Sequence, residues 1–311
     1  MPDAPLSAPA DAPRAAWRNV FLGPVRLRAG WRFGAYVVLT ALIGFVLRAL
    51  LLAMKVPLGD EWTPGSFIAA ELSTFAIAIA ATAIMARVDG LSFARFGIAW
   101  RPASVDLFWE GAFWGGAAVV VLVAGIAALG GYHIRGWSQT GGSLPANTLL
   151  WLAAMALVGL SEETSFRGYP LAALADGIGF WPASVVLSIV FAALHYFFKP
   201  MESIADGLSV GLLGLFLCFT LRRTGSLWFA IGFHFAFDFA AVPFFGAPNS
   251  GNHGRPVDTR LLDSSVSGPD WLTGGACGIE ASWLVFAVIA ALFALLRQRF
   301  PDARFPPPER S

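Results

Sequence analysis

Long apolar stretches recur along the chain, and they constrain its fold more than any other feature. Eight of them are apolar enough to cross a hydrocarbon layer of about 30 Å as helices, at about residues 33–54, 66–87, 107–130, 147–166, 181–198, 204–221, 226–246 and 281–299. Of the 311 residues, 57% are hydrophobic and only 13% are charged, and roughly 25% charged would be usual for a globular protein. The sequence therefore predicts an all-α fold, a polytopic membrane bundle of about eight transmembrane helices that has the lipid bilayer as a partner.

Basic residues are distributed unevenly between the two ends of these helices. The end that carries the N-terminal tail collects 15 Lys and Arg residues, and the opposite end collects five. The positive-inside rule then places both termini in the cytoplasm, which requires an even number of crossings and agrees with eight. We expect cytoplasmic tails at residues 1–32 and 301–311, a bundle over 33–300 and an outer loop over 247–280, in a multi-pass protein of the inner (plasma) membrane.

Charge and cysteine content exclude several classes of function. The formal net charge is +1, so no basic excess indicates a nucleic-acid partner, and we expect none. Cys218 lies in an apolar stretch and Cys277 in a polar one. We therefore expect no disulfide between them, and a zinc site of four cysteines is excluded.

Ionisable side chains inside the predicted helices are the candidates for function, because such groups are costly in lipid unless they face a partner or a cavity. Arg48, Glu71 and Glu110 lie near helix ends, where a long side chain can reach the interface, and we interpret them as structural. Six others fall within about 77 residues of one another and come from three helices: Glu162, Glu163, Arg167, His195, His234 and Asp238.

The first group lies on one predicted helix. Glu163 and Arg167 are four residues apart with the acid first, which favours an ion pair on one face. Glu162 is about 100° around the helix from Glu163 and must face something else. A carboxylate held in a low-dielectric pocket is suited to act as a general base for water.

Two histidines on separate helices complete the group. His195 follows Phe191 by four residues, and His234 precedes Asp238 by four. Asp238 should therefore share a helix face with His234, where it can fix the imidazole tautomer or share a metal with it. His133 and His253 fall in predicted outer loops, and we expect them at the surface.

The three segments together resemble the CPBP (also called Abi) family of type II CAAX prenyl endopeptidases, their bacterial relatives and bacteriocin-processing membrane proteins. The family pattern is Glu-Glu-x-x-x-Arg, then Phe-x-x-x-His, then His-x-x-x-Asn or a similar small polar residue in place of the Asn. Here the corresponding residues are Glu162, Glu163 and Arg167, then Phe191 and His195, then His234 and Asp238. The resemblance covers about residues 150–242, and we place the catalytic core at about 147–246.

This resemblance implies an intramembrane endopeptidase that hydrolyses a membrane-associated peptide or protein. It implies that Glu162 and His195 activate a water, that Glu163 and Arg167 support this geometry, and that His234 and the residue at 238 stabilise the oxyanion or help to hold a metal. Asp238 departs from the usual Asn, and an ionised Asp cannot donate a hydrogen bond to an oxyanion. Asp238 would then be protonated, or would orient His234.

The donor set leaves the metal question open. His195, His234 and Glu162 fit a zinc site with an open position, and they fit a metal-free, glutamate-dependent site equally well. No His-Glu-x-x-His string occurs in the chain, so the site-two type of metalloprotease is not supported.

One geometric problem accompanies this site. Glu162 lies near the inner end of its helix, and His195 lies about 21 Å along the next one at about 1.5 Å per residue. We expect either that the second helix begins outside the bilayer, or that residues 166–175 form a wedge between the two. In both cases hydrolysis requires a water-filled cavity, which we expect to open to the cytoplasm.

Other functions remain open from the sequence. Gly207-Leu208-Ser209-Val210-Gly211 resembles the Gly-x-Ser-x-Gly string of rhomboid serine proteases, with His234 as the base, although glycine and serine are also common packing residues in membrane helices. A transporter would place charged residues in the bundle too. An immunity protein could keep the fold without turnover.

Overall fold

The fold was analysed in a computed structural model that describes residues 21–23, 27–56 and 62–305. The predicted tails, 1–32 and 301–311, lie largely outside these residues. Ten α-helices are described: α2 (Ala29–Ala53), α3 (Pro64–Asp89), α4 (Ser104–Ala128), α5 (Ser143–Arg167), α6 (Tyr169–Ile178), α7 (Phe180–Phe198), α8 (Ile204–Thr224), α9 (Trp228–Phe239), α10 (Asp270–Thr273) and α11 (Leu284–Arg299). The shorter helices are η1 (Phe93–Phe96), η2 (Ala240–Phe244), η3 (Ser250–Asn252), η4 (Gly275–Cys277) and η5 (Ile279–Ala281).

Polar and glycine residues set the ends of the long apolar helices. The Thr63 hydroxyl accepts a hydrogen bond from the Ser66 backbone at 3.3 Å and so caps the start of α3, where Pro64 occupies the first turn. Gly90 and Gly225 end α3 and α8 with φ values of 67° and 70°, a left-handed conformation that suits glycine.

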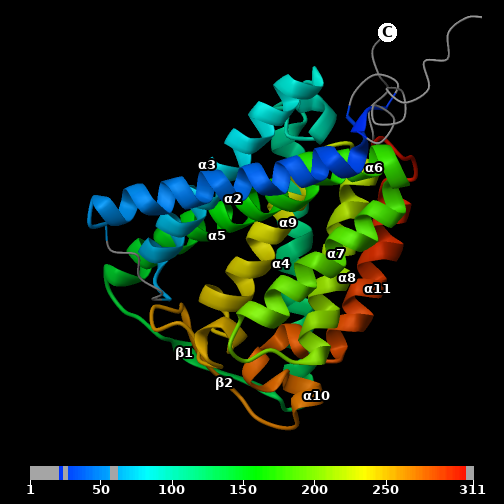
Figure 1. Cartoon of the computed structure of the whole chain (residues 1–311). Helices are drawn as coiled ribbons and strands as arrows, with labels where there is room; N and C mark the ends of the chain where they lie inside the picture. The colour runs from blue at the N-terminus through cyan, green and yellow to red at the C-terminus, as the bar shows by residue number, and fades with distance from the viewer. Residues whose placement is uncertain (1–20, 24–26, 57–61, 306–311) are drawn as a thin grey trace, which may run out of the picture.

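The helices confirm a polytopic membrane bundle. In the described part of the chain, six helical segments are long and apolar enough to span a membrane: Ala29–Ala53, Pro64–Asp89, Ser104–Ala128, Ser143–Ile178, Phe180–Phe198 and Ile204–Thr224. The other two expected spans are also helical but shorter, as Trp228–Phe244 and α11. In Figure 1, α7, α8 and α11 run side by side, and α2 crosses over the bundle.

Contacts between helix ends show how the segments alternate. At one end of the bundle, the Arg32 side chain near the start of α2 pairs with Asp89 at the end of α3 and with Asp176 in α6, each at 2.8 Å. The Arg304 backbone, beyond α11, donates to the Arg222 carbonyl at the end of α8. The start of the first described helix and the end of the last one therefore lie at the same end of the bundle (Figure 1).

A small sheet at the opposite end is an addition to the predicted all-α fold. Strands β1 (Tyr132–Trp137) and β2 (Leu262–Val266) pair antiparallel, with Tyr132 opposite Val266 and Trp137 opposite Leu262. The register shifts between Ile134 and Gly136. The sheet joins the loop after α4 to residues 247–280, so part of the predicted outer loop is ordered structure.

Glycines allow α9 to pack very closely against α4 and α5. A Cβ on Gly232 would lie 2.0 Å from the Phe108 carbonyl oxygen, and one on Gly111 would lie 2.1 Å from that of Phe229. A Cβ on Gly159 of α5 would lie 2.8 Å from the Ile231 oxygen. Small residues at such interfaces let helix backbones approach in a membrane. This close approach brings His234 on α9 against the acidic turn of α5.

Candidate active site

A buried ion pair on α5 is the base of the site. Arg167 Nη1 lies 3.1 Å from Glu163 Oε1, and the two side chains are 1% and 0% exposed. The guanidinium lies 4.5 Å from the centre of the Phe191 ring. A Cβ on Gly214 of α8 would lie 2.8 Å from Arg167 Nη2, so glycine at that position leaves room for the arginine. The expected pairing between Glu163 and Arg167 is therefore present.

Glu163 also contacts His234, which the sequence spacing did not indicate. His234 Nδ1 lies 2.9 Å from Glu163 Oε1. Because a carboxylate only accepts, this contact places a proton on Nδ1. The other ring nitrogen, Nε2, then faces Asp238 Oδ2 at 3.4 Å and Glu162 Oε2 at 3.6 Å.

Glu162 faces a cavity, as its position on the helix predicted. Its side chain is 25% exposed, and Oε2 is buried without a hydrogen-bond partner among the described residues. The 3.6 Å separation from His234 Nε2 is too long for a hydrogen bond. Because Oε2 is buried against His234, Oε1 is the oxygen available to a water or a substrate.

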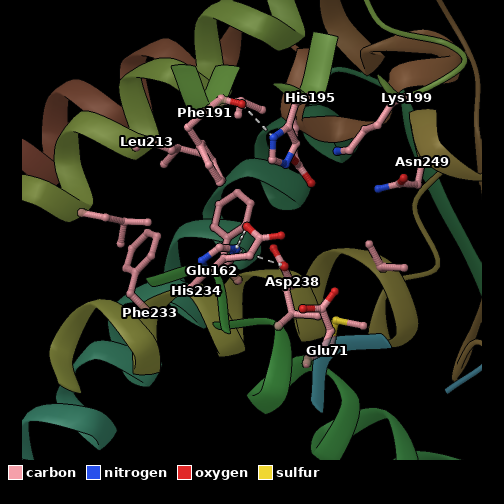
Figure 2. Close-up of a pocket in the computed structure, with 18 of the residues that line it drawn as sticks. Glu71, Glu162, Phe191, His195, Lys199, Leu213, Phe233, His234, Asp238 and Asn249 are labelled. Atoms are coloured by element: carbon pink, nitrogen blue, oxygen red, sulfur yellow. Dashed lines mark hydrogen bonds and ion pairs between the residues drawn. The ribbon is translucent and has the colours of Figure 1, made fainter. Parts of the chain in front are cut away.

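His195 approaches the same cavity from another helix. Its Nδ1 donates to the Phe191 carbonyl oxygen at 3.0 Å, an interaction within α7. A neutral imidazole that donates from Nδ1 keeps a lone pair on Nε2. Figure 2 shows His195 on one side of the cavity, with Glu162, His234 and Asp238 on the other.

The structure shows how Glu162 and His195 come to line one cavity despite their different positions along the helices. α5 ends at Arg167, and the separate helix α6 (Tyr169–Ile178) follows before α7 begins. Gly168, between α5 and α6, has a ψ of −121°, outside the helical range. The wedge expected at residues 166–175 is therefore present as α6, slightly later in the sequence.

The cavity has a volume of about 210 Å³, enough for several water molecules. It combines ionisable groups with an apolar wall, and the residues of that wall include Trp62, Phe67, Met155, Val158, Phe191, Val210, Leu213, Leu217, Phe233, Phe237 and Val242. One region can therefore bind an apolar peptide segment while another performs chemistry.

The cavity lies toward the end of the bundle opposite the termini, which differs from the expected cytoplasmic opening. Trp62 before α3 and Lys199 after α7 line it, together with Asn249 and Glu280 from residues 247–280. Within the described chain, no lining residue comes from the loops at the end where the termini lie. A cytoplasmic opening and cytoplasmic termini therefore cannot both hold.

Four further polar residues of this cavity were missed from the sequence. Glu71 was interpreted as an interfacial residue, yet it is the eighth residue of α3 and lines the cavity. Lys199, Asn249 and Glu280 were assigned to outer loops. A charged residue two turns inside an apolar helix was the available signal for Glu71; no local pattern marked the other three.

The remaining ionisable candidates lie apart from the cavity. His133 and His253 are exposed, as expected. Arg48 is exposed, and Glu110 pairs with Arg299 at 2.8 Å. The free thiols Cys218 and Cys277 form no disulfide.

The serine-protease alternative finds no support in the geometry. Ser209 is fully buried, and its hydroxyl donates to the Asp206 carbonyl of the same helix at 2.9 Å. The neighbouring Gly207 and Gly211 line an apolar groove between α7 and α8. A Cβ on Gly211 would lie 3.3 Å from the Ala192 side chain, so this string serves helix packing.

The zinc site considered from the sequence stays a prediction. Among the described residues, no three His, Cys, Asp or Glu side chains converge with the geometry of a metal site. His234 Nδ1 is bound to Glu163 and His195 Nδ1 to the Phe191 carbonyl oxygen, so each ring keeps Nε2, and one ring nitrogen is all that a histidine ligand uses.

The loop side of the cavity carries a titratable group of its own. Burial raises the pKa of the Glu280 carboxyl to about 7, with Asp238 adding to the rise and Lys199 opposing it. Glu280 belongs to η5, outside the membrane-spanning helices. The polar mouth of the cavity can therefore change its charge near neutral pH.

Comparison with known families agrees with the motif resemblance. Residues 144–240 match the family model of the type II CAAX prenyl endopeptidase Rce1-like proteins. Comparisons with curated proteins and with solved structures each found no match. The matched segment runs from α5 to the first residue of η2 and contains Glu162, Glu163, Arg167, His195, His234 and Asp238. Over residues 144–240, the chain is therefore similar to the type II CAAX prenyl endopeptidase Rce1-like family.

Proposed function

We propose that this protein is an intramembrane endopeptidase in which Glu162 and His195 activate the hydrolytic water. The proposal rests on one observation, the different contacts of two adjacent carboxylates. Glu163 is held by Arg167 and His234, whereas the Glu162 side chain lines the cavity, is 25% exposed and comes no nearer to His234 than 3.6 Å. A general base needs such an available carboxylate within reach of water.

The two histidines have different roles in this proposal. His195 Nε2 carries a lone pair and can accept one hydrogen of the water, which orients the oxygen while Glu162 removes the other proton. His234 stabilises the negative charge that develops on the oxyanion. Its Nδ1 is bound to Glu163, so the donor to the oxyanion is a proton on Nε2, the ring nitrogen that faces Glu162. Asp238, on the Nε2 side of the ring, stabilises the protonated imidazole.

These side chains account for the addition of water to the peptide bond. The water gives a proton to Glu162, and its oxygen adds to the peptide carbonyl carbon. The resulting oxyanion is stabilised by His234. When the C–N bond breaks, its electron pair goes to the nitrogen, which must also gain a proton.

The substrate class follows from the surroundings of the site. We propose a membrane-associated peptide or protein segment, because the cavity lies within a helical membrane bundle and has an aromatic wall that includes Phe67, Phe191 and Phe233. We place the protein in the inner (plasma) membrane on the basic-residue asymmetry.

The direct test is peptide cleavage by the purified protein in detergent, read with a quenched fluorescent peptide library. Glu162→Gln is nearly isosteric and should lower turnover by about 100-fold or more, with thermal stability close to that of the wild type. Glu110→Gln is the matched control, since Glu110 pairs with Arg299 outside the cavity. Full activity of Glu162→Gln would refute the glutamate mechanism.

A further inference from the structure

Glu71 is a carboxyl group of the cavity that lies outside the matched family segment. It comes from α3, far from residues 144–240 in sequence, and it lines the same cavity as Glu162, His234 and Asp238. The Ser161 hydroxyl donates to Glu71 Oε2. Ser161 directly precedes Glu162, so this hydrogen bond holds Glu71 against the turn of α5 that carries the proposed base. Figure 2 shows Glu71 and Asp238 on the same side of the cavity.

The position of His234 distinguishes Glu71 from Glu162 and Asp238. Asp238 and Glu162 lie 3.4 and 3.6 Å from His234 Nε2, so both can pair with an imidazolium. Glu71 forms no ion pair with any Lys, Arg or His of the described chain. Four carboxyls, those three and Glu280, share the cavity with Lys199, His195 and His234. Because like charges repel in a low-dielectric site and the carboxyls outnumber the cationic partners, the four cannot all be ionised.

The hydrogen bond from Ser161 indicates where a retained proton would sit. The single hydroxyl hydrogen of Ser161 can go to Glu71 Oε2 or to the Val158 carbonyl oxygen at 3.1 Å. When Ser161 donates to Oε2, a proton on the Glu71 carboxyl sits on Oε1. A neutral carboxylic acid beside the base is what the second half of peptide hydrolysis requires, since an amine leaves poorly as an anion.

We propose that Glu71 is the proton donor to the leaving amine, a role that rests on the peptidase function proposed above. Glu162 takes one proton from the water, and the hydroxide adds to the carbonyl carbon. As the C–N bond breaks, the nitrogen keeps the electron pair and takes the proton of Glu71. Glu71 is then a carboxylate and Glu162 a carboxylic acid, and transfer of that proton from Glu162 to Glu71 restores the starting state.

The test compares two leaving groups in Glu71→Gln, which keeps an acceptor for Ser161 but has no acidic proton. The probe is a peptide that the wild type cleaves in the quenched library, made both as its ordinary amide and as the 4-nitrophenyl ester of the same acyl part. Nitrophenolate leaves without protonation, so the variant should lose about 100-fold or more on the amide and far less on the ester. The alkaline limb of the amide pH profile should also disappear.

Controls separate this role from a structural one. Glu71→Asp keeps the acid and should recover part of the amide activity, and Glu110→Gln should match the wild type on both substrates. Equal losses on amide and ester in Glu71→Gln, or no loss on either, would overturn the proposal while leaving the peptidase function intact. If Glu71→Gln does not fold, an unchanged amide-to-ester ratio in Glu71→Asp overturns it. A wild type that cleaves no peptide would overturn the peptidase function and this role together.

Discussion

Glu163 and His234 lie 71 positions apart in the sequence, yet Glu163 Oε1 is 2.9 Å from His234 Nδ1 and 3.1 Å from Arg167 Nη1. One carboxylate oxygen therefore joins the ion pair of α5 to the histidine of α9. Glu163 fixes the ring orientation of His234, a role the sequence had suggested for Asp238. Asp238 is left on the other side of the ring, facing the cavity.

Loss of the buried ion pair should destabilise the fold. Arg167→Ala leaves Glu163 as a buried charge without its cation, which typically costs about 3–5 kcal/mol of unfolding free energy. Denaturation in detergent should show this loss together with a loss of activity. Arg135→Ala is the control, because the Arg135 side chain is 61% exposed beside Asp263 and should matter little. Wild-type stability in an inactive Arg167→Ala would instead place Arg167 in the chemistry.

Asp238→Asn tests how the residue beside His234 Nε2 acts. In the proposed mechanism the amide can donate a hydrogen bond to the oxyanion, so activity should be retained or increased. Chelators should leave the wild-type activity unchanged. If chelation removes activity that zinc restores, and His195→Ala or His234→Ala also loses bound metal, the metal-free route is wrong. Inactivity of Asp238→Asn in a chelator-resistant enzyme would contradict both routes.

Glu280 should make stability depend on pH. Its folded pKa is raised by burial from 4.5 to about 7, so the folded state binds the proton more tightly than the unfolded chain does. This contribution to stability is complete below pH of about 4.5 and is lost as the pH rises through about 7. Thermal midpoints between pH 5 and 8 should fall less steeply in Glu280→Gln than in the wild type. Identical slopes would rule out Glu280 as the titrating group.

Membrane topology can be read with reporter fusions. Both termini should be cytoplasmic and the β1–β2 end external, because basic residues gather at the end of the bundle that holds the termini. Fusions after residues 140 and 260 should report an external location, and fusions after residues 100 and 305 a cytoplasmic one. A cytoplasmic reading at 260 would require a different path for α9 and α11.

The sequence predicted what depends on local spacing. Apolar length indicated the helices, and the four-residue interval between Glu163 and Arg167 predicted their ion pair. The same helical periodicity predicted that Glu162 points away from that pair, and the Glu162 side chain does line the cavity. These features follow from helical geometry alone, which fixes the direction of a side chain relative to its near neighbours.

Only the tertiary structure decided which distant residues meet. The bond from Glu163 to His234 requires the close packing of α9 on α5 and α4, which depends on Gly159, Gly232 and Gly111. Glu71 lines the cavity because α3 packs against α5, and Glu280 lines it because η5 packs against α8. Tilt and packing arise from many contacts between segments distant in sequence, so no local pattern encodes them.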